Sequence, residues 1–339
     1  MKNVLLIILS VLFSLTLFGQ DTIVLNNNDV LIGEIKGLSK GVITFETAYS
    51  KDDFRIEWLE VKQVISNQNY LFTFSNGERM NGKFRSDKYN PEQIIITKND
   101  STTNVYNIHD LVYLHTVEMS FLSKLSLDIA VGYNYTKSQH NSQLTSNAKL
   151  NYTANYWNAN ANYSMVRGKQ DSVADVRRTE GGVGIKIFIY RDYFATASAN
   201  YLQNDEQKLE RRATYKVGTG KYLINSNRVY FVGILGVANT DEMYTDPTIP
   251  ARNSMEGYSN LQLNMFDVGD LSLLTSISFY PNLTQLGRYR ADFKFDIKYD
   301  FPLDLYIKFG TTMNYDSSPI QGATELDYFL QTTLGWEWN

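Results

Sequence analysis

The chain has 339 residues, 14% of them aromatic, with 24 tyrosines, 6 prolines and no cysteine. The absence of cysteine excludes a disulfide framework, a thiolate metal site and a thiol nucleophile. A net charge of −4 gives no reason to expect a nucleic-acid partner, and a mean hydropathy below zero excludes a polytopic helical membrane protein. A β-barrel stays open, because its strands alternate apolar and polar residues.

The first twenty residues have the layout of a secretion signal. Met1, Lys2 and Asn3 form a short basic start, residues 4–18 are almost wholly apolar, and a polar stretch begins after Gly19. A membrane-spanning helix needs roughly 20 apolar residues, so a cleaved signal at residues 1–20 is favoured over an N-terminal anchor. We therefore expect the mature chain to be exported.

Residues 21–117 contain an internal repeat. Residues 22–35 align with residues 71–84, and each copy reads as a strand, a tight Asn/Gly turn and a second strand that includes a glycine, Gly33 or Gly82. Such turns supply the positive φ that a hairpin needs. The pattern predicts a small periplasmic β domain that scaffolds or binds.

The repeat continues through residues 56–61 and 106–111, where Trp58 corresponds to Ile108. The boundaries are expected at about residues 21–67 and 68–117. Two small SH3-like repeats fit this pattern, and one fused β-sandwich is the alternative.

From residue 121 onward the chain alternates apolar and polar residues with period two, which is typical of half-buried strands. Most runs are long enough for a tilted strand to cross a bilayer. The pattern predicts an all-β domain at residues 121–339, a twelve-stranded antiparallel transmembrane β-barrel. The runs are 125–135, 144–156, 157–165, 181–189, 193–201, 213–221, 229–237, 259–265, 271–279, 289–299, 303–315 and 326–338.

The connections between these runs alternate in length. Those after even-numbered runs are short, whereas those after odd-numbered runs, such as residues 239–256, are longer and polar. Outer-membrane barrels have short periplasmic turns and long extracellular loops, so both termini are expected in the periplasm. The alternative is a soluble β-sandwich or ligand-binding barrel, which turns about every 8 to 12 residues.

The tenth run carries charges of alternating sign on one face, and the eleventh run adds two more. Lipid-facing Lys or Arg at mid-membrane would each cost roughly 2–4 kcal/mol, so these charges are expected to face the lumen. The lumen is then either self-neutralised and nearly closed, or a narrow polar pore without strong ion preference. The charges are Arg290, Asp292, Lys294, Asp296, Lys298, Asp304 and Lys308.

A turn at residues 300–302 sets the expected register of these two strands. It places Lys298 opposite Asp304, with Asp296 diagonal to Lys308 and within reach of that long side chain.

Residues 21–35, 152–157, 193–197 and 215–222 together resemble the YdiY-like family of salt-induced outer-membrane β-barrel proteins. The resemblance covers most of the mature chain, and its motifs are structural. It implies a barrel with a periplasmic β module, and it carries over no catalytic residues.

The sequence contains few candidates for catalytic or metal-binding residues. A lipid-cleaving barrel enzyme needs a histidine beside a serine or a metal, and His140 with Ser138 or Ser142 is the one such pairing, since His109 and His115 lie in the repeat region. An acidic group in the fourth long connection, Asp241, Glu242 and Asp246, is a weak calcium candidate. Glycine-rich residues 181–184 precede no helix and therefore form no nucleotide loop.

We expect no catalytic, cofactor or metal site. The predicted function is a structural or envelope-stress protein of the outer membrane or a narrow pore, and the alternative is a barrel enzyme acting on lipids. The expected partners are outer-membrane lipids and lipopolysaccharide, the barrel-assembly machinery and a periplasmic protein.

Overall fold

The computed structural model is all-β and divides into two compact units, one containing residues 20–71 and 80–117, the other residues 72–79 and 125–336. No helix among the described residues is long and apolar enough to cross a membrane. The structure describes residues 20–98, 100–117, 125–136, 141–154, 156–169, 176–268, 270–301 and 305–336.

The duplicated segment contains the same order of elements twice: four strands, a 3-10 turn and a fifth strand. The first copy comprises β1 (Asp21–Leu25), β2 (Val30–Ser39), β3 (Val42–Glu46), β4 (Phe54–Glu57), η1 (Trp58–Glu60) and β5 (Val61–Ile65). The second comprises β6 (Tyr70–Phe74), β7 (Arg79–Ser86), β8 (Gln93–Lys98), β9 (Thr103–Asn107), η2 (Ile108–Asp110) and β10 (Leu111–Thr116).

Six of these strands form one closed ring, in the hydrogen-bonded order β1, β5, β7, β6, β10, β2 and back to β1. Each copy contributes three strands, and the copies exchange edges, because β5 pairs with β7 and β10 pairs with β2. The two copies therefore share a single barrel and do not form two separate SH3-like barrels. Hairpins β3–β4 and β8–β9 extend the ring at equivalent places.

Gly33 and Gly82 occupy equivalent sites in the two copies, each where a neighbouring strand crosses closely. A Cβ at Gly33 would lie 2.0 Å from the Glu46 carbonyl oxygen, and one at Gly82 would lie 2.5 Å from the Thr97 carbonyl oxygen. Both positions therefore require glycine. The repeat alignment found this pair because the same steric demand recurs in both copies.

Trp58 and Ile108 begin the two equivalent 3-10 turns and contact each other. The buried indole N–H of Trp58 donates a hydrogen bond to the Ile108 carbonyl oxygen over 2.8 Å. A second buried cluster surrounds Asp21. The Tyr70 hydroxyl and the Ile35 amide each donate a hydrogen bond to its carboxylate over 2.8 Å. Burial, reinforced by the Asp21 charge, raises the pKa of Tyr70 well above its usual range.

Trp58→Phe keeps a buried ring at this junction but removes the N–H, so the Ile108 carbonyl keeps only the Leu111 amide as its donor. We expect the opening free energy of amides in β5 and β10 to fall by about 0.5–1.5 kcal/mol, the net contribution of one hydrogen bond. Hydrogen exchange of the full-length protein measures this opening free energy. Tyr49→Phe is the control, because Tyr49 is 68% exposed; equal effects of the two changes would contradict the role of the bond.

The second sheet has twelve antiparallel strands in sequence order, each paired with the next. All twelve predicted runs are strands, and most are longer than the alternation alone indicated. They are β11 (Leu125–Thr136), β12 (Asn141–Thr153), β13 (Trp157–Lys169), β14 (Val176–Tyr190), β15 (Tyr193–Asn204), β16 (Leu209–Asn225), β17 (Val229–Tyr244), β18 (Arg252–Val268), β19 (Leu271–Pro281), β20 (Tyr289–Asp300), β21 (Leu305–Asp316) and β22 (Leu326–Trp336).

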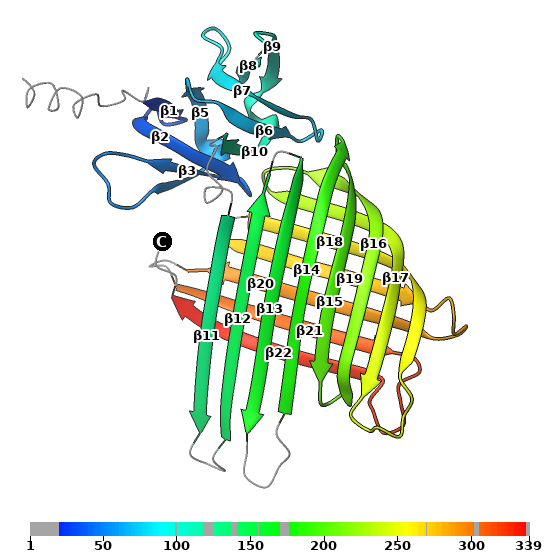
Figure 1. Ribbon diagram of the computed structural model, residues 1–339. Helices are drawn as coiled ribbons and strands as arrows, with labels where there is room; N and C mark the ends of the chain where they lie inside the picture. Colours follow the sequence, from blue (N-terminus) through cyan, green and yellow to red (C-terminus); the bar gives the residue numbers. More distant parts are fainter. Residues whose placement is uncertain are drawn as a thin grey trace, which may run out of the picture. The chain divides into compact units, whose positions relative to one another are not determined.

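This sheet curls strongly, so that the later strands β19–β22 pass behind β11–β15 in Figure 1. Glycines on β16 and β17 permit a close approach of these strands, since a Cβ at Gly236 would lie 2.1 Å from the Val217 carbonyl oxygen. Along β13–β21, even-numbered side chains face the concave side and odd-numbered ones face outward. The parity is reversed in β12, where Leu150 is exposed, and in β22, where Asp327 faces the interior. Side-chain contacts between strands far apart in the order, described below, establish the concave side as an enclosed interior.

The predicted register between β20 and β21 was wrong. The ladder pairs Lys298 with Lys308, not with residue 304, because β20 continues to Asp300 and β21 begins only at Leu305. The longer connection shifts the pairing by four residues, which keeps the side chains on the same face. Asp304 itself lies outside the described residues.

Candidate functional site

An arginine that reaches across the sheet shows that the concave side is enclosed. The Arg178 guanidinium on β14 lies 3.1 Å from the Asp327 carboxylate on β22 and donates to the Asn314 side-chain oxygen on β21, also over 3.1 Å. In the strand order of the sheet, β21 stands seven positions after β14 and β22 stands eight positions after it. A link of this kind is possible only if the sheet curls around a narrow interior.

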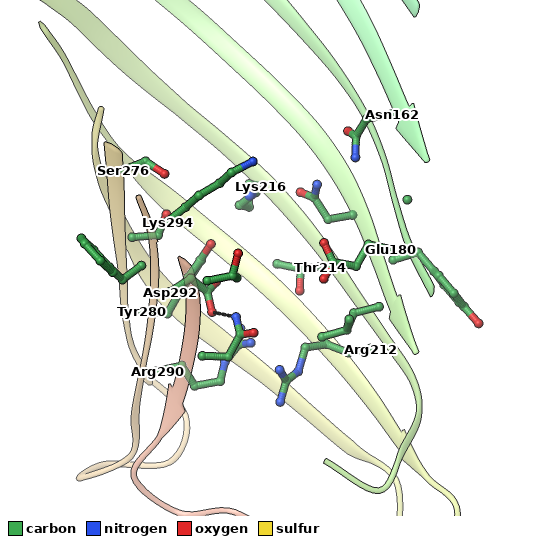
Figure 2. Close-up of a pocket in the computed structure, with 18 of the residues that line it drawn as sticks. Asn162, Glu180, Arg212, Thr214, Lys216, Ser276, Tyr280, Arg290, Asp292 and Lys294 are labelled. Atoms are coloured by element: carbon green, nitrogen blue, oxygen red, sulfur yellow. Dashed lines mark hydrogen bonds between the residues drawn. The ribbon is translucent and has the colours of Figure 1, made fainter. Parts of the chain in front are cut away.

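The interior contains a pocket of about 240 Å³ lined by polar and charged side chains from β13 to β21. Figure 2 shows Glu180 and Arg212 on one wall and Tyr280, Arg290 and Asp292 on the facing wall. Lys216 and Lys294 also line it. Because period-two alternation and the ladder register place even-numbered residues of β13–β21 on this side, charges from many strands converge here.

A buried ion-pair network lies at the end of the interior where the long connections meet. The guanidinium of Arg288 lies 2.9 Å from Glu242 and 2.6 Å from Asp316, and Arg212 lies 2.7 Å from the other Glu242 oxygen. The side chains of Arg288 and Glu242 are 2% and 1% exposed. Buried charges need such partners, because an uncompensated one costs several kcal/mol.

A second ion pair extends the network toward the pocket. The Arg290 guanidinium lies 2.6 Å from Glu256 and donates to the Thr240 hydroxyl over 3.1 Å. That hydroxyl in turn donates to Glu256 over 2.7 Å. Strands β17, β18 and β20 are thereby tied together on their concave faces.

Loops pack over this same end. Leu209, Tyr244 and Ile320 form a buried apolar cluster with Ile249 and Ala323 against it, and these residues come from β16, β17 and the connections after β17 and β21. The Arg252 guanidinium also donates to the Ser318 carbonyl oxygen over 3.1 Å, joining the same two connections. The long-connection end of the interior is therefore covered by an apolar layer above a charged one.

Aromatic side chains fill part of the opposite, short-turn end. Phe194 is fully buried and packs over Gly220, where a Cβ would lie 2.4 Å from its ring. The ammonium of Lys186 lies 4.4 Å from the Phe194 ring centroid and 5.0 Å from that of Tyr222. Tyr222 continues the cluster through Tyr230 to Phe266.

The structure places the six sequence-predicted charges that it describes, all but Asp304, on one side of β20 and β21. Arg290, Asp292 and Lys294 line the pocket. Asp296 lies 3.6 Å from Lys294 and 3.8 Å from Lys308, so the diagonal contact predicted for Asp296 and Lys308 is present. The ammonium of Lys298 lies 2.9 Å from Asp300, which offsets the like charge of Lys308 directly across the ladder.

The sequence reasoning did not place Arg178, Arg212, Glu242, Glu256 and Arg288 in the interior ion pairs, nor Lys216 in the pocket. Lys216 occupies an even position of a predicted run, so parity could have placed it on the concave face. Four of the others lie where β14, β16, β17 and β18 extend beyond the predicted runs. Arg288 lies in a connection and gave no such signal.

The weak calcium candidate does not assemble. Asp241 pairs with Arg211 at 2.7 Å, Glu242 belongs to the arginine network, and Asp246 accepts from the Thr248 hydroxyl at 2.7 Å. That hydroxyl and the Thr248 amide hold the pKa of Asp246 below its usual range. No group of side chains suited to hold a metal occurs in the part of the chain that the structure describes. His140 and Ser138 lie outside it.

A curled antiparallel sheet around a charged, enclosed interior is typical of β-barrel-like proteins, and the second unit has this architecture. Residues 129–338, more than half of the chain, match the model of a family described as a protein of unknown function, DUF481. The chain belongs to this family, the YdiY-like outer-membrane β-barrel family, as the sequence resemblance predicted. A search of curated proteins finds no match to the chain.

Arg288→Met leaves Glu242 and Asp316 buried with one partner fewer. We expect it to destabilise the second unit by about 3–5 kcal/mol, the cost of breaking a buried ion pair on one side. Arg211→Met is the matched control, because the Arg211–Asp241 pair is largely exposed, at 44% and 32%, and such pairs contribute only about 0–1 kcal/mol. Thermal unfolding of the full-length protein in detergent compares them, and similar melting temperatures would contradict the network's role.

Proposed function

We propose that the chain is an outer-membrane β-barrel protein whose twelve strands close around the polar interior, with the duplicated segment in the periplasm. In this proposal it serves as a structural or envelope component or as a narrow pore that is closed at its long-connection end. The observation that carries the proposal is the inverted distribution of side chains, with charges inside the curled sheet and apolar residues outside it.

The outer face supports insertion into lipid. Large apolar side chains at odd positions are exposed along the sheet, Leu235 by 69%. Contiguous apolar surface of this extent marks an interaction or membrane surface. Further exposed members are Leu127, Ile129, Val183, Ile185, Ile187, Val217, Leu261 and Ile277.

Strand length supports the same proposal. The shortest of the twelve strands, β19 and β22, have 11 residues and the longest, β16 and β18, have 17. A strand tilted in a bilayer needs about 9–11 residues to cross it. Each strand is therefore long enough to span, and the longer ones extend beyond the apolar layer.

The interior supports a structural role or a narrow pore over a wide channel. Ion pairs and loops cover one end, and aromatic rings occupy part of the other. A barrel of about eight strands is filled by its own side chains, and one of about sixteen leaves an aqueous channel, so twelve strands lie between these cases. Outer-membrane lipids, lipopolysaccharide and the barrel-assembly machinery are the partners that this placement entails, with a periplasmic protein as the partner of the duplicated segment.

Two neighbouring positions on β20 test the membrane assignment. Phe295→Arg puts a charge on the outward face, which costs about 2–4 kcal/mol near mid-membrane. This variant should therefore fail to assemble. Lys294→Gln lies on the concave face and should assemble normally. The measurement is recovery in the outer-membrane fraction, together with the mobility of unboiled and boiled samples on a denaturing gel, which differ for a closed barrel.

Recovery of the unaltered protein in the soluble periplasm, with one mobility for both samples, would overturn the proposal. Assembly of Phe295→Arg with failure of Lys294→Gln would reverse the faces of the sheet.

A further inference from the structure

The arginines that line the interior pocket are already matched by carboxylates. Arg178 lies 2.6 Å from Glu180 as well as 3.1 Å from Asp327. Arg212 and Arg290 have Glu242 and Glu256 within 2.7 Å and 2.6 Å. Arg212 and Arg290 are thus each matched by an acid, whereas Arg178 is shared by two carboxylates.

Lys216 on β16 differs from the arginines. It lines the same pocket, and its ammonium lies 5.0 Å from the centroid of the Tyr258 ring. Within the described part of the chain no carboxylate forms an ion pair with it. A partly buried ammonium without a paired anion is costly, and a ring face compensates only part of that cost.

Lys294 on β20 also points into the pocket, as Figure 2 shows. Its partner Asp296 lies 3.6 Å away but is shared with Lys308 at 3.8 Å. Two ammonium groups thus share one carboxylate, and both contacts are long. One positive charge remains uncompensated on this wall.

One carboxylate in the pocket opposes this excess. Asp292 accepts a hydrogen bond from the Asn314 amide at 2.8 Å and forms no ion pair with described residues. Glu180, the other acid that lines the pocket, is paired with Arg178. The pocket therefore presents two incompletely matched ammonium groups, the Asp292 carboxylate without an ion pair, and Glu180, which shares Arg178 with Asp327. Neutral donors such as Ser276, Ser278 and Thr312 surround them.

We propose that this pocket binds a small oxyanion, such as a phosphate or carboxylate group on a free solute, between Lys216 and Lys294. Ammonium groups form short, strong hydrogen bonds to such oxygens, and hydroxyl groups add neutral donors. The inference deepens the proposed function by naming the chemistry of a solute for the interior. It replaces the sequence-based expectation of a lumen without ion preference.

Calorimetric titration of the full-length protein with inorganic phosphate, in a non-ionic, phosphate-free detergent, tests the proposal. We expect saturable binding that weakens about tenfold with Lys216→Gln or Lys294→Gln, the effect of losing one charged hydrogen bond. Asp292→Asn removes the opposing charge and should tighten binding. Lys298→Gln is the matched control, because Lys298 is paired with Asp300 and does not line the pocket.

Two variants should weaken binding, one should tighten it and the control should leave it unchanged, so the result is decisive even if Lys216→Gln does not fold. A saturable site weakened by Asp292→Asn and indifferent to both pocket lysines is a cation site, which overturns the proposal. Absence of phosphate binding by protein whose gel mobility still depends on boiling also overturns it. Phosphate binding by protein lacking that mobility difference would instead overturn the membrane assignment and leave the anion site standing.

Discussion

Ion pairs inside the curled sheet are the interaction on which the second unit depends. Alternation along twelve strands brings charged residues to the concave face, where little water can solvate them. Each buried carboxylate of the network must therefore meet a guanidinium, as Glu242 meets Arg212 and Arg288. Such pairs join strands that are not neighbours, such as β14 and β22 through Arg178 and Asp327. The curl is thus fixed by directional contacts between charges.

The size of interior side chains decides where space remains. Glycine at position 220 admits the Phe194 ring, and the Gly218–Gly236 pair lets β16 and β17 approach closely. Aromatic rings then fill one end, and arginines with their acids fill the other. Between them lie shorter polar groups, such as Ser276 and Thr312, that cannot meet across the interior, so the pocket remains there.

Much of the second sheet could be predicted because its signals are local. Alternation and turn residues placed all twelve strands and put Arg290, Asp292 and Lys294 on one face. The register of β20 and β21 could not be predicted as reliably, since it depends on whether the chain turns at residue 302 or continues to Leu305. The partners of Arg178 and Glu242 were also out of reach, because those contacts depend on how far the whole sheet curls.

The duplicated segment shows a different limit. Sliding the sequence on itself identified equivalent residues, such as Gly33 with Gly82, but equivalence does not say which copy supplies the partner of each edge. In the structure β5 pairs with β7 and β10 with β2, so neither copy completes a barrel from its own strands.

This exchange of edges has a consequence for the history of the segment. One copy alone contributes three strands to the ring, β5–β1–β2, and lacks the partners that β5 and β2 find in the other copy. The pairings β5–β7 and β2–β10 become the same contact when the two copies are treated as identical. Two separate chains of a single copy can therefore close the same six-stranded ring as a twofold-symmetric homodimer. Gene fusion of such a dimer yields this topology without any new strand pairing. The contact between the equivalent residues Trp58 and Ile108 then lies at the former twofold axis, where the two copies now differ in sequence.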